Sequence, residues 1–210
     1  MFSGKPVIGI VGGIGSGKSF IAHLFGELHC AVIDSDAQVR LAYADPGVLR
    51  TLREWWGDEI FLPDGQINRA TIARRVFNDP IERKRLEGLI HPYVSEARKR
   101  EMGILAHDPG TVAFVWDTPL LFEAGLEGEC DAVVFVDAPF ELRLGRVAQT
   151  RGWDEAELRR RENLQWPLDR KRKISDYVIE NTADAGEARS QVRAVFSRIL
   201  ERAACFRGPA

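Results

Sequence analysis

Short apolar runs and longer amphipathic runs alternate along most of this chain. Runs rich in β-branched and aromatic residues predict buried strands at 7–11, 31–33, 111–116, 132–136 and 177–179. Hydrophobic positions recur at helical spacing over 18–28, 37–43, 139–150 and 185–204. Strands separated by helices predict a mostly parallel, five-stranded sheet that has helices on both faces.

The segment 48–100 departs from this alternation, because it contains no convincing strand pattern. It predicts an amphipathic helix that ends at Gly57, and further helices at about 69–77 and 80–89. His91 precedes Pro92, and a residue before proline disfavours helical geometry, so we expect a break there before a helix resumes over 93–102. The segment is predicted to be an all-helical insertion in an α/β protein, a place where such proteins often bind a second substrate.

A glycine-rich loop joins the first strand to the first helix. Its sequence, GGIGSGKS at 12–19, fits GxxxxGK[ST]. Glycines let successive backbone N–H groups turn around a phosphate, and the following helix directs its positive end there. Lys18 is expected to reach the β- and γ-phosphates of ATP, and Ser19 to ligate Mg²⁺. A glycine-rich turn without chemical use is disfavoured, because strand, loop and helix fall where phosphate binding needs them. The expected nucleotide contacts are Gly13, Gly15, Ser16, Gly17, Lys18, Ser19 and Phe20.

Acidic residues follow several predicted strands, where ligands gather in parallel sheets. Asp34 and Asp36 are candidates to accept the proton of an attacking hydroxyl or to hold a metal-bound water. The alternative is that Asp34 or Ser35 caps the next helix. Asp117 follows its strand in the manner of a Walker B acid, which holds Mg²⁺ or its water. Asp137 and Asn181 also follow strands and can meet the others at one edge.

Arginines are frequent in the second half of the chain. Arg146, with Arg143 and Arg151, could supply positive charge to phosphates as a lid closes. The same holds for the basic residues between 159 and 173. The alternative is a solvated helix with ion pairs four residues apart, and we favour it for most of that cluster.

Composition narrows the class of protein. The 210 residues are 45% hydrophobic and 29% charged, with a formal net charge of −2, which is ordinary for a globular protein. The length suits one domain with insertions, or one and a half domains. The charge argues against general nucleic-acid binding, and no apolar run is long enough to span a bilayer. The three cysteines are far apart, so neither a disulfide framework nor a zinc site is predicted. We expect Cys30 and Cys130 to be buried and the protein to be cytoplasmic.

Five motifs together resemble the dephospho-CoA kinase family: GGIGSGKS, IDSDAQVR, HPYV, DTPLLFE and DYVIENTAD, in this order between residue 7 and about residue 184. The resemblance implies a three-layer P-loop NTPase fold. It implies a kinase that uses ATP and Mg²⁺ to phosphorylate the ribose 3′-hydroxyl of dephospho-CoA, which gives coenzyme A and ADP in the last step of coenzyme A synthesis. The implied partner is this small molecule, without nucleic acid or membrane, and the chain is expected to be a monomer or small homo-oligomer.

The resemblance also implies roles for residues and segments. Asp36 would be the general base, Arg40 would hold the acceptor, Arg146 would lie near the ATP phosphates and Asn181 near the adenosine. The implied nucleotide-binding core is 1–38, 101–145 and 175–210, the CoA-binding insertion is 39–100 and the lid is 146–174. Residues that would line the acceptor pocket are His91, Pro119, Leu120, Leu121, Phe122 and Glu123.

Three residues depart from the family pattern. Phe20 stands where a threonine usually follows the loop serine, Val11 replaces a frequent threonine, and Ser35 replaces a common alanine between the two aspartates. These departures concern individual contacts and leave Lys18, Ser19 and Asp36 unchanged.

Two other functions fit the same residues. A nucleoside or nucleoside monophosphate kinase would also have a helical insertion and a lid. A nucleotide-binding switch would keep the loop without transferring a phosphoryl group, although the [NT]KxD element of guanine-specific switches does not occur in the chain.

Overall fold

The computed structural model describes residues 1–182 and 184–206, and the side chains of Asn78 and Phe206 are outside that description. Of the predicted core segment 175–210, Ala183 and residues 207–210 therefore lie outside the described residues. The chain divides into two compact units, Met1–Ile33 with Met102–Ala210, and Asp34–Glu101. No helix in the described part of the chain is both long and apolar enough to cross a bilayer.

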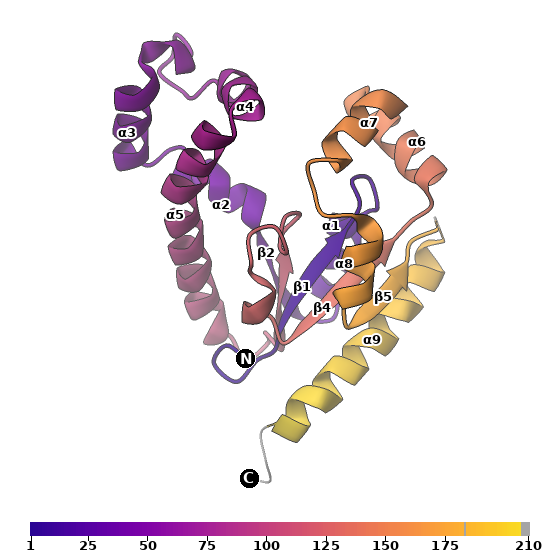
Figure 1. Cartoon of the computed structure of the whole chain (residues 1–210). Coiled ribbons are helices and arrows are strands. Elements are labelled where there is room, and N and C mark those ends of the chain that lie inside the picture. The colour runs from indigo at the N-terminus through magenta and orange to yellow at the C-terminus, as the bar shows by residue number, and fades with distance from the viewer. Residues whose placement is uncertain (183, 207–210) are drawn as a thin grey trace. The chain divides into compact units, whose positions relative to one another are not determined.

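The first unit is built on a five-stranded sheet in the order β2-β3-β1-β4-β5 (Figure 1). Neighbouring strands run parallel, with Ile8 opposite Ala132 and Gly12 opposite Val136. The predicted α/β class is confirmed, and the sheet is parallel throughout rather than mostly so. Its strands are β1 Val7–Gly12, β2 Cys30–Asp34, β3 Ala113–Asp117, β4 Ala132–Asp137 and β5 Tyr177–Glu180.

Both faces of the sheet are covered, which explains the continuous apolar runs. Ile8 and Ile10 of β1 belong to a core with α1 and α9, where Phe25 meets Phe196 edge to face. The alternate residues, Val7 and Val11, belong to the core on the other face. The helices of this unit are α1 Lys18–Gly26, α6 Phe140–Arg151, α7 Glu155–Glu162, α8 Leu168–Ile174 and α9 Ala185–Phe206.

The Asp34–Glu101 unit is helical, as its pattern predicts. It has its own apolar core, in which Val48, Leu52, Ile60 and Ile72 are almost completely buried. Its one described β interaction is an isolated antiparallel bridge between Phe61 and Ile67. Its elements are α2 Ser35–Ala42, α3 Pro46–Trp56, the 3₁₀ turn Asp58–Ile60, α4 Arg69–Asn78 and most of α5, Pro80–Ala106.

The break predicted at His91 is wrong, because α5 continues through Pro92. The core of this unit contains Ile90 before the proline and Val94 after it, so burial on both sides favours one continuous helix. The proline ring would press on the carbonyl four residues earlier, which belongs to Gly88, the residue type that most easily lets its backbone adjust. His91 is an exposed residue in the middle of a helix.

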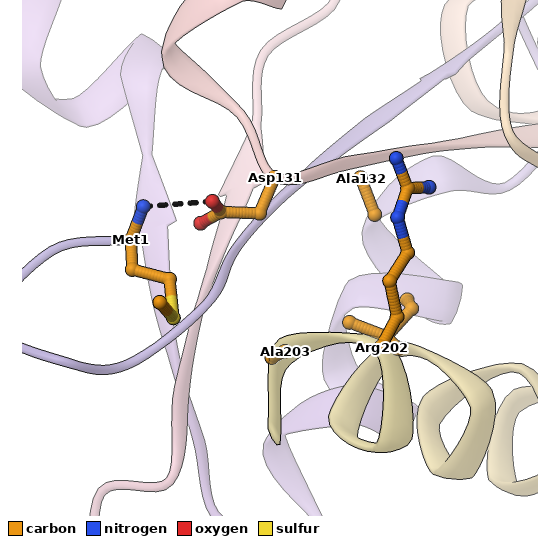
Figure 2. Close-up of a pocket in the computed structure, with 6 residues that line it drawn as sticks. Met1, Asp131, Ala132, Arg202 and Ala203 are labelled. Atoms are coloured by element: carbon orange, nitrogen blue, oxygen red, sulfur yellow. Dashed lines mark hydrogen bonds and ion pairs between the residues drawn. The ribbon is translucent and has the colours of Figure 1, made fainter. Parts of the chain in front are cut away.

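A hollow of about 340 Å³ lies at the amino end of β4 (Figure 2). The terminal amino group of Met1 is 2.7 Å from Asp131 Oδ1 there, and Asp131 Oδ2 accepts a hydrogen bond from the Val7 backbone at 2.8 Å. The glycine-rich loop follows the carboxyl end of β1, so this hollow and the loop lie at opposite ends of the parallel strands. Its lining residues are Met1, Asp131, Ala132, Ile199, Arg202 and Ala203.

The three cysteines are free thiols. Cys30 is buried, as expected, and burial raises the pKa of its thiol to about 12. Cys130 is only half-buried, and its side chain approaches the Leu126 carbonyl oxygen at 3.8 Å. Cys205 is exposed.

Candidate active site

The glycine-rich loop is a tight turn between β1 and α1. Gly12, Gly15 and Gly17 have φ values of 152°, 76° and 90°, which L side chains rarely adopt. The Lys18 ammonium donates to the carbonyl oxygens of Gly12 at 3.1 Å and Gly13 at 2.9 Å, so it is held over the loop. Ser16 is completely buried, and its hydroxyl makes no hydrogen bond within the described part of the chain. A buried hydroxyl of this kind suits a phosphate oxygen.

Arg146 and Asn181 support this loop from outside. The Arg146 guanidinium donates to the carbonyl oxygens of Gly15 at 3.3 Å, Ser16 at 3.1 Å and Asn181 at 3.2 Å. The buried Asn181 side chain donates to the same Ser16 oxygen at 2.7 Å. Burial lowers the pKa of Arg146. Both residues therefore fix the loop carbonyls, and their contact with a nucleotide stays a prediction.

Arg143 has a different role from Arg146, although the sequence pattern predicts the same role for both. It is buried, donates to the carbonyl oxygens of Ala138 at 3.2 Å and Ile14 at 3.3 Å, and forms an ion pair with Glu162 of α7. Its charge is paired, and its contacts join the glycine-rich loop to α7. The nearest sequence signal is its spacing from Arg146, which puts both on one face of α6.

Burial lowers the pKa of Lys18 to about 8. The carboxylate of Asp117 opposes this shift, whereas the positive charges of Lys171, Arg151 and Arg143 add to it. Several cations therefore act on one lysine at the carboxyl edge of the sheet. An excess of positive charge at a glycine-rich loop favours a polyanionic ligand.

The two aspartates after β2 have different environments within their own unit. Asp34 is the N-cap of α2: its Oδ1 accepts from the Ala37 backbone at 3.0 Å, and its Oδ2 is 3.3 Å from the Arg40 guanidinium. Asp36 is exposed in the first turn, and its carboxylate makes no hydrogen bond or ion pair with any described residue. The capping interpretation of Asp34 is confirmed, and Asp36 has the carboxylate that is available for chemistry.

The two residues predicted to hold a Mg²⁺ ion belong to different elements. Ser19 is exposed in the first turn of α1, and Asp117 is the last residue of β3. Among the described residues, no group of three or more His, Cys, Asp or Glu side chains could hold a metal. Mg²⁺ in phosphoryl-transfer sites takes one or two protein ligands and completes its shell with phosphate and water, so this small set fits it.

The segment after β3 is mostly core. Leu121 and Phe122 are buried, Pro119 is half-buried, and Leu120 is 46% exposed. Of the apolar residues predicted to line an acceptor pocket here, Leu120 therefore offers the most accessible surface. The other two predicted acceptor residues, Arg40 and His91, belong to the Asp34–Glu101 unit.

Glu123 ends this segment and has a partner that the sequence pattern does not predict. Its Oε1 is 2.7 Å from the ammonium of Lys171 and accepts from the Trp166 backbone at 2.8 Å. Lys171 is completely buried, although it belongs to the charged cluster that favoured a solvated helix. The available signal was its position three residues after Leu168, which packs on the core.

Comparison with known proteins gives a consistent result. A profile of the family described as dephospho-CoA kinase matches residues 6–187. The chain is 38% identical over 196 residues to a dephospho-CoA kinase of Syntrophotalea carbinolica, which covers 92% of both proteins. It is 42% identical over 184 residues to one of Anaeromyxobacter dehalogenans, which covers 87% of this chain and 86% of the relative.

Solved structures are similar along nearly the whole chain. TT1252 of Thermus thermophilus has a TM-score of 0.82 and 34% identity, and the match covers 92% of this chain and 97% of that one. A shikimate kinase of Acinetobacter baumannii has a TM-score of 0.51 and 18% identity, with 96% of each chain covered, so it shares the fold alone.

Proposed function

Because the chain belongs to the dephospho-CoA kinase family, which carries out the final step of coenzyme A biosynthesis, we propose that Asp36 is the general base of this reaction. The kinase activity follows from the family, and the roles of individual residues are the proposal. The proposal also specifies ATP as the phosphoryl donor and the ribose 3′-hydroxyl of dephospho-CoA as the acceptor. The family favours this acceptor over a nucleoside and favours a kinase over a switch.

The observation that carries the proposal is the loop that bears Lys18. Its carbonyls are held by Arg146 and Asn181, its lysine lies over the turn, and the buried Ser16 hydroxyl has hydrogen-bonding capacity left in the described structure. Such a loop binds the β- and γ-phosphates of a nucleotide through its amides and its lysine.

The transfer needs one proton to move and one P–O bond to be exchanged. Asp36 accepts the proton of the 3′-hydroxyl as its oxygen attacks the γ-phosphorus, and the bond to the bridging oxygen of ADP breaks. Lys18 neutralises negative charge on the phosphates. Arg146 uses three hydrogen bonds on loop carbonyls, and a guanidinium has five N–H donors, so it retains donors for a phosphate oxygen.

Ser19 and Asp117 are the residues proposed to hold Mg²⁺. When bound, the ion would supply charge neutralisation to the β- and γ-phosphate oxygens. Asp117 has a second effect, because its carboxylate raises the pKa of Lys18 and so helps to keep that lysine protonated.

We further propose that residues 39–100 bind the acceptor and that residues 146–174 act as a lid. The first is supported by the separate apolar core of the Asp34–Glu101 unit, which lets an insertion fold around its own substrate. The second is supported by the ion pair between Arg143 and Glu162, which connects α7 with the glycine-rich loop.

An acceptor-dependent assay tests the reaction. We expect ADP release from ATP only when dephospho-CoA is added, with coenzyme A as the product by mass. Nucleosides, nucleoside monophosphates and shikimate serve as matched acceptors, and shikimate controls for the shared fold. Preference for any of these, or ADP release that does not depend on the acceptor, would refute the proposed function.

The lowered pKa of Lys18 predicts a proton uptake when nucleotide binds. In the free protein the ammonium loses its proton as the pH rises through about 8, and bound phosphates stabilise the charged form. At about pH 8.5 we therefore expect ADP binding to take up a proton, and affinity to fall as the pH rises further. Calorimetry in buffers of different ionisation enthalpy measures this uptake. The Lys18→Arg variant is the control, because its side chain stays charged, and equal uptake by both proteins would contradict the assignment.

A further inference from the structure

Lys171 is the exception within a charged helix. The sequence of α8 is LDRKRKI, and its other charged residues are exposed, whereas Lys171 has no exposed surface. Removing an ammonium from water is costly unless it is paired and hydrogen-bonded. The chain provides both, which indicates that this position depends on specific partners.

Those partners come from outside α8. The Lys171 ammonium is 2.7 Å from Glu123 Oε1 and donates to Gln165 Oε1 at 3.1 Å. Glu123 also accepts from the Trp166 backbone, and the Trp166 ring stacks on Phe122 with centroids 5.9 Å apart and planes 5° apart. One lysine thus ties the segment between α7 and α8 to the segment that follows β3.

This ion pair lies beside the phosphate loop. α8 packs against β1 (Figure 1). A Cβ on Gly13 would come within 3.1 Å of the Leu168 side chain, one turn before Lys171. Burial is the main cause of the lowered pKa of Lys18, and the positive charge of Lys171 contributes to the same shift. A charge has such an effect only on a group close to it, so the two ammonium groups are near each other.

The pair also has hydrogen-bonding capacity left over. Glu123 Oε2 is buried and makes no hydrogen bond within the described residues. The Lys171 ammonium has three N–H donors and two acceptors among these residues. If the pair served only to stabilise the fold, hydrogen-bond partners for the Glu123 oxygen and for the remaining Lys171 N–H would make the fold more stable, since an unsatisfied buried oxygen costs free energy.

We propose that Lys171 is a positioning residue of the kinase reaction, acting through Glu123 to hold the 118–123 segment in place for the acceptor beside the glycine-rich loop. The inference rests on the proposed function, because residues 119–123 of this segment are the ones predicted to line the acceptor pocket. Glu123 is the link: its carboxylate joins the position of that segment to the position of α8. Loss of the pair would therefore weaken the productive placement of the acceptor more than it weakens nucleotide binding.

Four variants test this proposal. We expect Lys171→Met and Glu123→Gln each to lower kcat/KM for dephospho-CoA about tenfold or more, with the Kd for ADP within about threefold of the parent. Lys171→Arg keeps the charge and should recover part of the loss. Arg198→Met is the matched control, because it removes an exposed cation from α9, outside the proposed lid, and should leave the kinetics unchanged.

A double variant separates positioning from stability. Lys171→Met combined with Glu123→Gln leaves no unpaired buried charge, so it should fold even if a single variant does not. We expect it to be no less active than the worse single variant, because both remove one interaction. A folded double variant with the parent kcat/KM for dephospho-CoA, or equal losses for acceptor and nucleotide, would overturn the proposal. The parent is assayed in parallel: if it does not phosphorylate dephospho-CoA, the proposed function fails instead.

Discussion

The Asp36→Asn variant is expected to lose about 100- to 10,000-fold in kcat, while its affinity for ATP stays close to that of the parent. The amide has nearly the shape of the carboxylate and cannot accept the hydroxyl proton. Asp36 makes no hydrogen bond or ion pair with the described residues, so the change disturbs no contact that holds the fold. Steady-state kinetics with dephospho-CoA and a separate nucleotide-binding titration measure the two quantities independently.

Two further variants make this result specific. Asp45→Asn is the matched control, because Asp45 caps α3 through the Gly47 and Val48 backbones, and asparagine caps a helix equally well. It should keep the parent rate. Asp34→Asn tests the other candidate base: if it abolished turnover while Asp36→Asn remained active, the base would be Asp34.

The fold could be predicted because the sheet is covered on both faces. Each strand is then a continuous apolar run, which is visible without any knowledge of its partners. Each predicted strand ends one residue before the observed strand, for a related reason. Asp34, Asp117, Asp137 and Glu180 are the last residues of their strands, since backbone pairing continues where side chains become polar at the functional edge. Of these residues, Asp117 is the one proposed to hold Mg²⁺, and Asp34 caps α2.

Pro92 shows where local preference misleads. The residue before a proline disfavours helical geometry on its own, but α5 packs on an apolar core on both sides of that point. Tertiary burial supplies more free energy than the lost hydrogen bond costs. A single sequence contains the proline but not the packing that compensates for it.

The buried cations could not be separated from the exposed ones by composition. Arg143 pairs with Glu162, and Lys171 pairs with Glu123, which is far away in the sequence. A charged helix is normally solvated, so the sequence favours exposure for most of its charged residues and does not mark the exceptions. Which lysine becomes buried depends on a carboxylate that only the fold brings close.

The Gly17→Ala variant is expected to lose about 100-fold in kcat/KM for ATP, because the change displaces the phosphate loop. Gly17 has φ 90° and ψ 30° as the N-cap of α1, which costs an alanine about 1 to 3 kcal/mol. An added Cβ would also overlap the Asn181 side-chain nitrogen, which is buried and bonded to the Ser16 carbonyl oxygen. The loop or Asn181 must therefore move, and the amides before Lys18 move with it.

Gly145→Ala is the matched control for this change. Gly145 lies inside α6, with nothing within 4 Å of an added Cβ, so alanine there should preserve activity and slightly raise the melting temperature. Thermal unfolding shows whether Gly17→Ala is folded at the assay temperature. Asn181→Ala added to Gly17→Ala removes the overlap but not the backbone strain, so nucleotide binding should recover only in part. A folded Gly17→Ala protein that binds ATP as the parent does would show that the loop tolerates the side chain, and the close fit between Asn181 and the glycine-rich loop would then have no part in holding the phosphates.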